Sequence, residues 1–385
     1  MRKQAILAVG LALVFVASFT QVCVSAERDL VLRGVHEAAI DLPRVLFLLK
    51  RQADGPALGS GGRLGVNYAF LDTGGSGVLL SRETANLLGV GVEPNARFVD
   101  IGIGGDEYFD VSEPLYIGLA DYEEKNPHDS AVYKILGPGR VQVKRESAGL
   151  LGQPLDIMGV PVMAGRVVVL DSGATNNLGF FAAEIKEPGD PSIPKVDLTV
   201  ALRFENFLNP NNPKNIRPLP SLSYNPVIDN IVIGYRGKQS KGNWLFDTGA
   251  TVSFISTDQA KRIGLIGKNG RPLVTQAFSV PVGGIGAIVQ IPGFEIEGLT
   301  VPTLSGRNLV YDKPRLGVHD ISYFDEDEGK FVTLDGVFGS NFLCATASME
   351  DLLSLDIGQT IFEKIVLDMR QGLLGFDIND GYRQP

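Results

Sequence analysis

The chain of 385 residues contains an internal duplication, and each copy carries an aspartate at the same place. The first copy reads VNYAFLDTGGSGVLLSRETANLLG around Asp72, and the second reads GNWLFDTGATVSFISTDQAKRIG around Asp247. Counted from each aspartate, a serine follows after nine residues, an alanine after thirteen and a glycine after seventeen: Ser81 and Ser256, Ala85 and Ala260, Gly89 and Gly264. Each DTG triplet follows an apolar strand-like run and precedes a helix-like run. We therefore expect a repeated unit that contributes one carboxylate per half.

The similarity between the halves extends beyond the aspartates. Three equivalent elements follow in the same order in each half. The first is a glycine-rich hairpin candidate, IGIGG at 101–105 and VGGIG at 282–286. The second is a short apolar element that ends in glycine, GLLG at 149–152 and GVFG at 336–339, and the third is a closing β-branched strand at 167–173 and 364–372. Glycines at a hairpin tip permit the φ values of a tight turn and let the backbone approach a peptide closely. The candidates for substrate-binding flaps are therefore Gly104, Gly105, Gly283 and Gly284.

A further motif, LDSGAT at 170–175, looks like a third active-site loop. In the frame of the repeat, however, Asp171 corresponds to Asp368 in the closing strand of the second half. We interpret Asp171 as a turn residue at a strand end, and a third catalytic loop is the alternative.

Proline content marks a boundary between the halves. Residues 186–226 hold eight of the 22 prolines, and such a segment cannot sustain a helix or a central strand. We predict a connector there, with one strand near 197–204, between an N-terminal catalytic part at 27–185 and a C-terminal one at 227–385. Elsewhere short β-rich runs broken by Gly and Pro dominate, and helical patterns occur near 82–88, 257–263 and 349–355. The expected class is mainly β.

The first residues have the pattern of a secretory signal. Two basic residues at positions 2 and 3 precede an apolar run at 5–19, and VSA at 24–26 forms a cleavage site. We predict a signal peptide at 1–26 and an exported protein, periplasmic or secreted. An uncleaved membrane anchor is the alternative, whereas a lipoprotein is disfavoured because Gln and Val precede Cys23.

Signal cleavage would leave about 359 residues (385 minus 26), enough for two ordinary domains, with Cys344 as the only cysteine. No internal disulfide could then form. We interpret Cys344 as a buried apolar residue, with a nucleophile as the alternative. Cleavage would also leave 33 basic against 44 acidic residues (35 minus 2 against 44), a net charge of −11. That balance argues against nucleic acid or an anionic membrane surface as a partner, and we expect no membrane insertion after cleavage.

Two aspartates on equivalent loops suggest acid–base chemistry by a pair. Carboxylates brought about 3 Å apart repel by about 5 kcal/mol at an effective dielectric near 20, so one proton is shared between them. One group can then act as general base on a water while the other, protonated, polarises a carbonyl, without metal or cofactor. The small and hydroxyl residues of each loop support this pair: Gly74 and Gly249 let the backbone N–H groups approach the carboxylates, and Thr73 and Thr248 can bond across the interface of the halves. A single DTG triplet would more simply be an Asx-turn at a strand end.

With these motifs in both halves, the sequence resembles the aspartic peptidases, in a bilobal pepsin-like arrangement with retropepsin-like repeats. FLDTGGSG and LFDTGAT match the Asp-Thr-Gly signature of that family, GLLG and GVFG match its downstream element, and VGGIGAIV at 282–289 looks like a retropepsin flap. The resemblance implies two homologous β-barrel-like lobes with a cleft between them, Asp72 and Asp247 as the catalytic pair, and an extended polypeptide as substrate. It also implies a monomer whose active site is intramolecular. Gly75 and Ala250 depart from it, because they stand where pepsin-like members commonly have Ser or Thr. The departures from the family, among them the lack of an internal disulfide, suggest a bacterial exported member.

Other readings remain open at this stage. The same fold could grip a peptide or another ligand without cutting it, and an envelope interaction protein would also carry an export signal. The run DEDE at 325–328 could bind calcium, although it lacks EF-hand spacing and reads as a solvated loop. The three histidines lack metal-ligand spacing, so a zinc enzyme or a serine hydrolase has little support.

Overall fold

The computed structural model describes residues 28–59, 66–146, 155–172, 181–207, 218–325, 329–348 and 360–382. The predicted signal peptide at 1–26, the GLLG element at 149–152 and the helix expected at 349–355 lie outside these residues. Among the described residues, no helix combines the length and the apolar character needed to cross a membrane.

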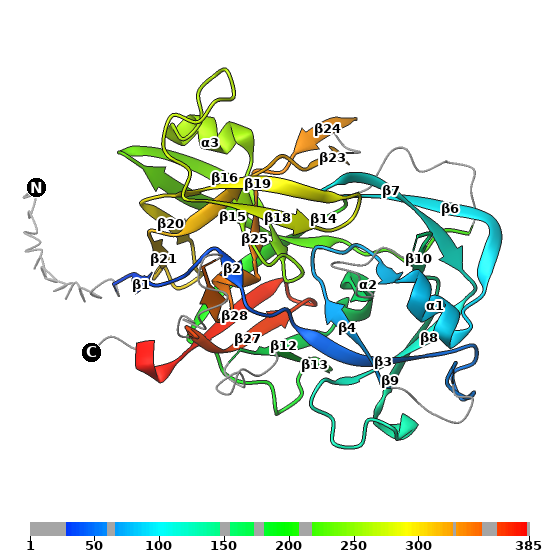
Figure 1. Ribbon diagram of the computed structural model, residues 1–385. Coiled ribbons are helices and arrows are strands. Elements are labelled where there is room, and N and C mark those ends of the chain that lie inside the picture. Colours follow the sequence, from blue (N-terminus) through cyan, green and yellow to red (C-terminus); the bar gives the residue numbers. More distant parts are fainter. Residues whose placement is uncertain are drawn as a thin grey trace, which may run out of the picture.

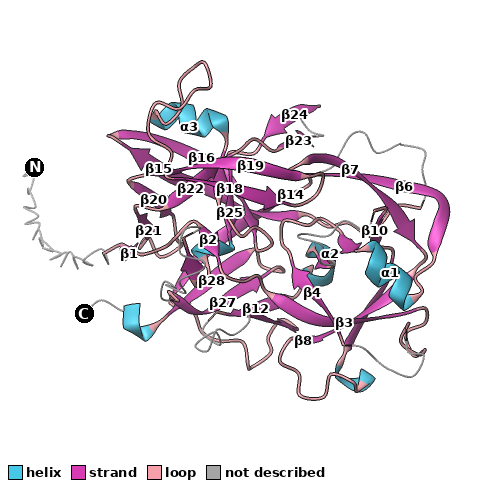
Figure 2. Cartoon of the chain, viewed as in Figure 1, coloured by secondary structure: helices cyan, strands magenta, loops and turns pink. Residues whose placement is uncertain are grey.

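The expectation of a mainly β class is confirmed (Figures 1 and 2). Up to residue 205 the strands are β1 (Leu30–Leu32), β2 (Ala38–Ala39), β3 (Arg44–Lys50), β4 (Asn67–Leu71), β5 (Val78–Leu80), β6 (Val92–Gly102), β7 (Gly105–Ser112), β8 (Leu115–Asp121), β9 (Lys134–Gly139), β10 (Gln142–Lys144), β11 (Ile157–Met158), β12 (Val167–Asp171), β13 (Ala182–Lys186) and β14 (Leu198–Glu205). The later strands are β15 (Asn225–Tyr235), β16 (Lys238–Asp247), β17 (Phe254–Ile255), β18 (Phe278–Gly283), β19 (Ile288–Glu295), β20 (Gly298–Val301), β21 (Leu309–Asp312), β22 (Arg315–Val318), β23 (Ser322–Asp325), β24 (Lys330–Thr333), β25 (Gly336–Gly339), β26 (Thr346–Ala347), β27 (Phe362–Asp368) and β28 (Leu373–Ile378). The α-helices of the described residues are α1 (Arg82–Leu88), α2 (Val160–Met163) and α3 (Thr257–Ile263).

The duplicated serines and glycines are the caps of two equivalent helices. Ser81 accepts a hydrogen bond from the Thr84 N–H at the start of α1, and Ser256 accepts one from the Gln259 N–H at the start of α3. Both helices end at a glycine in the left-handed region, α1 at Gly89 with φ 67° and α3 at Gly264 with φ 83°. An N-cap hydroxyl and a C-terminal glycine satisfy helix ends at low conformational cost, which explains why these residue types recur at fixed distances from each aspartate. The helices expected at 82–88 and 257–263 are confirmed.

The strands do not form the separate closed barrels that the resemblance implied. Within the described residues, 24 strands from both halves belong to one mixed sheet, and no barrel closes. The reason lies in the closing strands, each of which pairs with a strand of its own half and also with the closing strand of the other half. Strand β12 runs antiparallel to β27, with Val169 opposite Val366, and β14 runs antiparallel to β28. Two equivalent strands in antiparallel register are related by a local two-fold axis, so this pairing also places the two halves symmetrically.

The N-terminal segment crosses into the second half. Strand β1 pairs in parallel with β21, with Leu30 opposite Leu309, and β2 pairs antiparallel with β26. One cluster of buried apolar side chains correspondingly contains residues of both halves, among them Phe47 at 1% exposure and Trp244 at 0%. The two halves are therefore joined by backbone pairing and by a common core, which fixes the position of one active-site loop against the other.

Candidate active site

Each DTG loop begins where an apolar strand ends, and a short strand pairs in parallel with that apolar strand. Asp247 is the last residue of β16, opposite Gly339 of β25, and Asp72 follows β4, whose Leu71 lies opposite Met158 of β11. Strands β4, β11, β16 and β25 carry almost only buried side chains next to the loops. The aspartates are thus held by the rigid part of the sheet, as a site that needs fixed geometry requires.

Backbone N–H groups of each loop hold its own carboxylate. The N–H groups of Gly74 and Gly75 donate to Oδ1 of Asp72 at 2.7 and 3.1 Å. In the second half the N–H groups of Gly249 and Ala250 donate to Oδ1 of Asp247 at 2.8 and 3.1 Å. The two arrangements agree within 0.1 Å, so the duplication in sequence becomes a symmetric pair of carboxylates.

The two threonines join the loops through buried, reciprocal hydrogen bonds. The Thr73 N–H donates to Oγ1 of Thr248 at 3.1 Å, and the Thr248 N–H donates to Oγ1 of Thr73 at 3.0 Å. Each hydroxyl donates onward to a carbonyl of the opposite half, Thr73 to Phe246 at 2.6 Å and Thr248 to Leu71 at 2.7 Å. Because both threonines are at most 1% exposed, every one of these groups would otherwise be buried without a partner. The predicted bond across the interface is present in both directions.

The two loop glycines have a second role that the sequence alone did not suggest. A Cβ atom on Gly74 would lie 2.5 Å from Cγ of Asp247, and one on Gly249 would lie 2.4 Å from Cγ of Asp72. Each glycine therefore lies against the carboxyl group of the opposite loop, at a distance that no side chain could occupy. Glycine is required here for close approach as well as for its own backbone N–H.

The two carboxyl groups share a half-buried position and hydrogen-bond each other. Burial raises the pKa of Asp72, although the bonds from Asp247 and from the loop N–H groups oppose the rise. Burial also raises the pKa of Asp247 well above its usual range, and the neighbouring charge of Asp72 adds to the effect. Since the raised pKa values belong to a coupled pair, the pair keeps one proton at a pH where isolated aspartates have lost theirs.

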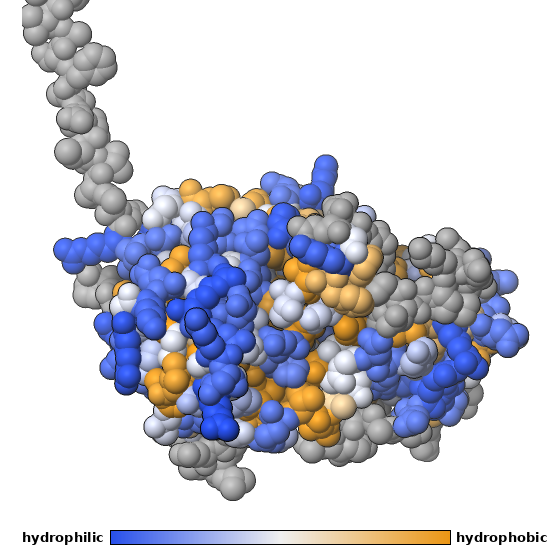
Figure 3. Space-filling model, turned by 90° about the horizontal axis from the view of Figure 1, so that it is seen from above, coloured by the Kyte–Doolittle hydropathy of each residue, from blue (hydrophilic) through white to orange (hydrophobic). Residues whose placement is uncertain are grey.

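The glycine-rich segments are the tips of two hairpins that touch each other. Gly104 lies in the turn between β6 and β7, and Gly105 is the first residue of β7. Gly283 is the last residue of β18, and Gly284 lies in the turn to β19. The two hairpins approach from opposite halves at the top of the molecule (Figure 1). The side of the molecule seen from above in Figure 3 carries a broken band of apolar residues between polar flanks. Large exposed apolar side chains occur on the strands of these hairpins and on β24, namely Tyr108, Ile288 and Phe331.

Three hydrogen bonds hold the tips. The Gly104 N–H donates to the Ile285 carbonyl at 2.9 Å, and the Gly286 N–H donates to Glu107 at 3.0 Å. The third bond anchors the first tip to the second half, where Nε2 of His319 donates to the Ile103 carbonyl at 2.8 Å.

Each tip also inserts an isoleucine into the opposite half. Ile103 packs against a cluster that includes Phe254 and Val337, and Ile285 packs against one that includes Phe98 and Ile157. The exchange is reciprocal, so the two hairpins close over the molecule as a pair.

GLLG lies outside the described residues, and another segment of the first half occupies the place equivalent to β25. In the second half, β25 pairs in parallel with β16. In the first half, Ile157 and Met158 of β11 pair in the same way with β4, and Gly159 follows them. The Val160 N–H donates to the Gly75 carbonyl at 2.8 Å, and the equivalent Ser340 N–H donates to Ala250 at 2.8 Å. GLLG satisfied the same pattern by composition, but only strand pairing distinguishes the two candidates.

Two buried polar groups next to the loops were missed at the sequence level. The Asn225 side chain, 0% exposed, donates through Nδ2 to the carbonyls of Thr73 and Gly74 at 2.9 Å each. Asp100 on β6, 8% exposed, accepts a bond from the Gln142 amide at 3.0 Å. Neither lies in a motif. The one available signal was a charged residue in the otherwise apolar inward pattern of 96–100.

The remaining candidates lie apart from the pair. Asp171 is the last residue of β12 and forms an ion pair with Lys364, which confirms its place at a strand end. Cys344 is buried, and burial raises its pKa to about 12, so the thiol stays protonated and inert. Of the DEDE run, Asp325 ends β23 and the other residues lie outside the described part. The described residues contain no group of three or more His, Cys, Asp or Glu side chains placed to hold a metal ion.

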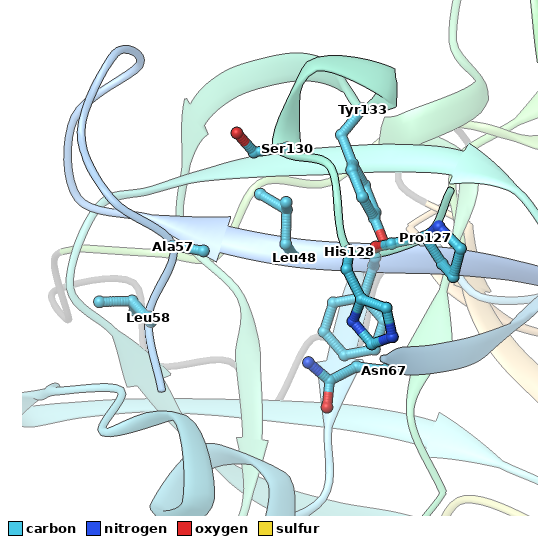
Figure 4. Close-up of a pocket in the computed structure, with 9 residues that line it drawn as sticks. Leu48, Ala57, Leu58, Asn67, Pro127, His128, Ser130 and Tyr133 are labelled. Atoms are coloured by element: carbon cyan, nitrogen blue, oxygen red, sulfur yellow. The ribbon is translucent and has the colours of Figure 1, made fainter. Parts of the chain in front are cut away.

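A cavity of about 20 Å³ lies in the first half, away from both DTG loops (Figure 4). Apolar side chains of β3 such as Leu48 and the polar groups of Asn67, His128 and Tyr133 line it. Its volume fits about one water molecule. It is therefore no candidate for an organic ligand.

Comparison with known proteins does not place the chain in a family. No family model matches it, and no curated protein matches it. Among solved structures, basic 7S globulin from soybean is similar at a TM-score of 0.42 and 9% identity, covering 87% of this chain and 95% of its own. Conglutin gamma, a basic 7S globulin from lupine seeds, is similar at a TM-score of 0.41 and 8% identity, covering 89% of this chain and 97% of its own.

The assignment to the aspartic peptidase family is therefore wrong by these comparisons. No family model supports it, and the two similar structures are named as plant globulins. The TM-scores of both likenesses are below 0.5, so they indicate neither a function nor a detailed fold for this chain. What the chain does has to be argued from its own site.

Proposed function

We propose that this protein hydrolyses peptide bonds within extended polypeptides, by a water molecule activated between Asp72 and Asp247. The observation that carries the proposal is the symmetric hydrogen bonding of the two carboxylates, each held by two loop N–H groups at 2.7–3.1 Å and joined through the threonine pair. A structural Asx-turn needs one such loop. It does not need two carboxyl groups pressed together in a half-buried place, where their mutual repulsion costs stability.

In the proposed reaction the pair starts with one proton. The ionised carboxylate removes a proton from the water as its oxygen attacks the carbonyl carbon, while the protonated carboxyl group donates a hydrogen bond to the carbonyl oxygen. The tetrahedral intermediate then collapses: the C–N bond breaks, and the leaving nitrogen receives a proton from the pair. One water is consumed, and the pair returns to its singly protonated form without metal or cofactor.

The proposal includes the arrangement that would admit a polypeptide. The two halves would act as homologous lobes, the substrate would lie extended between them over the DTG loops, and the hairpin tips would close on it from above. Gly104 and Gly284 would face its backbone, because glycines permit such close approach. The chain would act as a monomer, since one polypeptide supplies both carboxylates. It would act outside the cytoplasm, because residues 1–26 have the pattern of a secretory signal.

The test is hydrolysis of unfolded casein across pH by the wild type and by three variants. Asp72→Asn and Asp247→Asn should each abolish cleavage with circular dichroism unchanged, and Asp171→Asn should retain most of it, since Asp171 pairs with Lys364 at a strand end. A statine-type peptide should inhibit the wild type. Cleavage that survives either dyad substitution would refute the mechanism. Binding of the peptide without cleavage by the wild type would indicate a peptide-binding protein instead.

A further inference from the structure

Asp100 is a buried carboxyl group on the inner face of the first hairpin. It lies on β6 in the same alternation as Ala96 and Phe98, whose side chains belong to the buried cluster that receives Ile285. The Asp100 side chain is itself 8% exposed, so it points inward with them. Burial raises the pKa of Asp100 to about 6, and the nearby charges of Asp72 and Glu107 add to this rise.

The charged groups that act on the pKa of Asp100 are acidic. The charge of Asp72, in the first DTG loop, acts on the pKa of Asp100, and Glu107 lies directly opposite on β7. Its own hydrogen bonds come from the neutral Gln142 amide at 3.0 Å and from the backbone N–H of Ile101 at 2.9 Å. Among the described residues Asp100 forms no ion pair, and Lys144 on β10 is paired with Glu107 at 3.3 Å.

The surroundings connect Asp100 to the site. The Gln142 amide that bonds it also lies against Gly77, five residues after Asp72, where an added Cβ would be 2.7 Å from Nε2. On the other side, Ile285 of the second hairpin covers Gly102, two residues along the same face of β6, where an added Cβ would be 2.5 Å from the Ile285 Cβ. Withdrawal of the second tip would therefore uncover the face of β6 that carries Asp100, next to the first DTG loop.

A buried carboxyl group in acidic surroundings is ionised at a cost, and a cation beside it removes that cost. From this geometry we infer that Asp100 is a specificity-determining residue, which selects a lysine or arginine side chain of the peptide next to the scissile bond. The inference rests on the proposed function, since it names the substrate of the same site. The substrate cation would take the place of the proton that Asp100 otherwise keeps, and the Gln142 amide would hold the carboxylate in position.

The test compares peptides that differ only in lysine or norleucine on either side of the scissile bond. Wild-type kcat/KM should favour the lysine peptide by about tenfold near pH 7, the size of one charge-assisted hydrogen bond. The lysine-to-norleucine ratio should fall between about pH 7 and pH 5 as Asp100 takes up its proton. Because both peptides meet the same dyad, the pH dependence that they share cancels from the ratio.

Asp100→Asn should bring the ratio close to one at every pH. Asp110→Asn is the matched control on the same hairpin, since Asp110 is already paired with Arg82 and Arg145, and it should leave the ratio as in the wild type. Equal cleavage of both peptides by the wild type, or a ratio unchanged in Asp100→Asn, would overturn the inference while leaving hydrolysis intact.

A binding measurement separates this inference from the proposed hydrolysis. In the Asp247→Asn background, calorimetry should show the same preference for the lysine peptide, and Asp100→Asn should remove it. If the wild type cleaves no peptide but binds lysine peptides in an Asp100-dependent way, hydrolysis fails and the selectivity stands. If binding shows no such preference, the selectivity is wrong.

Discussion

The backbone N–H of Gly104 donates a hydrogen bond to the carbonyl of Ile285, and so joins the tips of two hairpins that belong to different halves of the chain. The contact is tight: an added Cβ on Gly104 would lie 1.9 Å from the backbone nitrogen of Ala287. In this closed arrangement each tip also inserts an isoleucine into the other half. In the proposed function, entry of a polypeptide beneath the tips would require this contact to break.

We predict that Gly104→Ala separates the tips. The methyl group cannot fit against Ala287, so amide hydrogen exchange at 101–106 and 283–288 should rise several-fold, and KM for a peptide should change more than kcat. Gly234→Ala is the control, because an added Cβ there meets no atom closer than 3.8 Å. Unchanged exchange at both tips in Gly104→Ala would show that the closed contact does not exist in solution.

We predict that Gly249→Ala impairs the pair far more than Gly75→Ala. The first would place Cβ 2.4 Å from Cγ of Asp72, whereas the second would meet Ile157 at 3.4 Å, an ordinary contact. A displacement near 1 Å at a reacting group costs about 100-fold, so kcat/KM should fall by about that factor in Gly249→Ala. Steady-state kinetics on one peptide compares the two variants. Similar losses in both would mean that close packing against the opposite carboxyl is not what requires glycine.

The threonine pair should stabilise the fold as well as the site. Thr248→Val removes the acceptor of the Thr73 N–H and the donor to Leu71, and leaves buried backbone groups without partners. The free energy of unfolding should fall by about 2–6 kcal/mol, from roughly 1–3 kcal/mol for each of the two unsatisfied groups. Thr248→Ser keeps the hydroxyl and should cost much less. Urea titration measures both, and equal losses would attribute the effect to packing of the methyl group.

The residue after each DTG should set the acidic limit of activity. Gly75 and Ala250 have no hydroxyl to bond the ionised carboxylate, so the raised pKa values of the pair are set by burial, by the backbone N–H groups and by the two carboxyl groups acting on each other. A serine hydroxyl would favour the ionised form and lower the apparent pKa. We expect a wild-type optimum in weakly acidic to near-neutral conditions, and a lower acidic limb of the kcat/KM profile in Ala250→Ser and in Gly75→Ser. An optimum below about pH 3 that neither variant shifts would show that other groups control the protonation of the pair.

Asp100 should make stability depend on pH. Burial raises its folded pKa to about 6, above the value of an unfolded aspartate, so the folded protein holds this proton more tightly. The resulting stability is complete below about pH 4, is lost as the pH rises through about 6, and is absent above that. Asp100→Asn does not titrate. Relative to the wild type, it should therefore gain about 3 kcal/mol between pH 4 and pH 8, for a shift of about two pKa units. Urea unfolding at both pH values measures the gain, and a constant difference would mean that Asp100 does not titrate in this range.

The duplicated local patterns determined the secondary structure around the site. Serine at nine residues and glycine at seventeen residues from each aspartate fixed the ends of α1 and α3, because caps act through neighbouring backbone groups. The same frame placed Asp171 at a strand end and the glycine-rich segments at hairpin tips. These features depend on interactions within about twenty residues, which a sequence pattern records directly.

Pairing between distant segments was decided only by the tertiary structure. The sequence did not distinguish GLLG from Ile157–Gly159, since both are apolar pairs before a glycine, and only the parallel pairing with β4 selects the second. The pairing of β12 with β27 likewise replaced two closed barrels by one sheet. The approach of each loop glycine to the opposite carboxyl group follows from packing between the halves. Such contacts join residues as far apart as the 175 positions between Asp72 and Asp247, and no local rule of backbone or side-chain preference reaches that far.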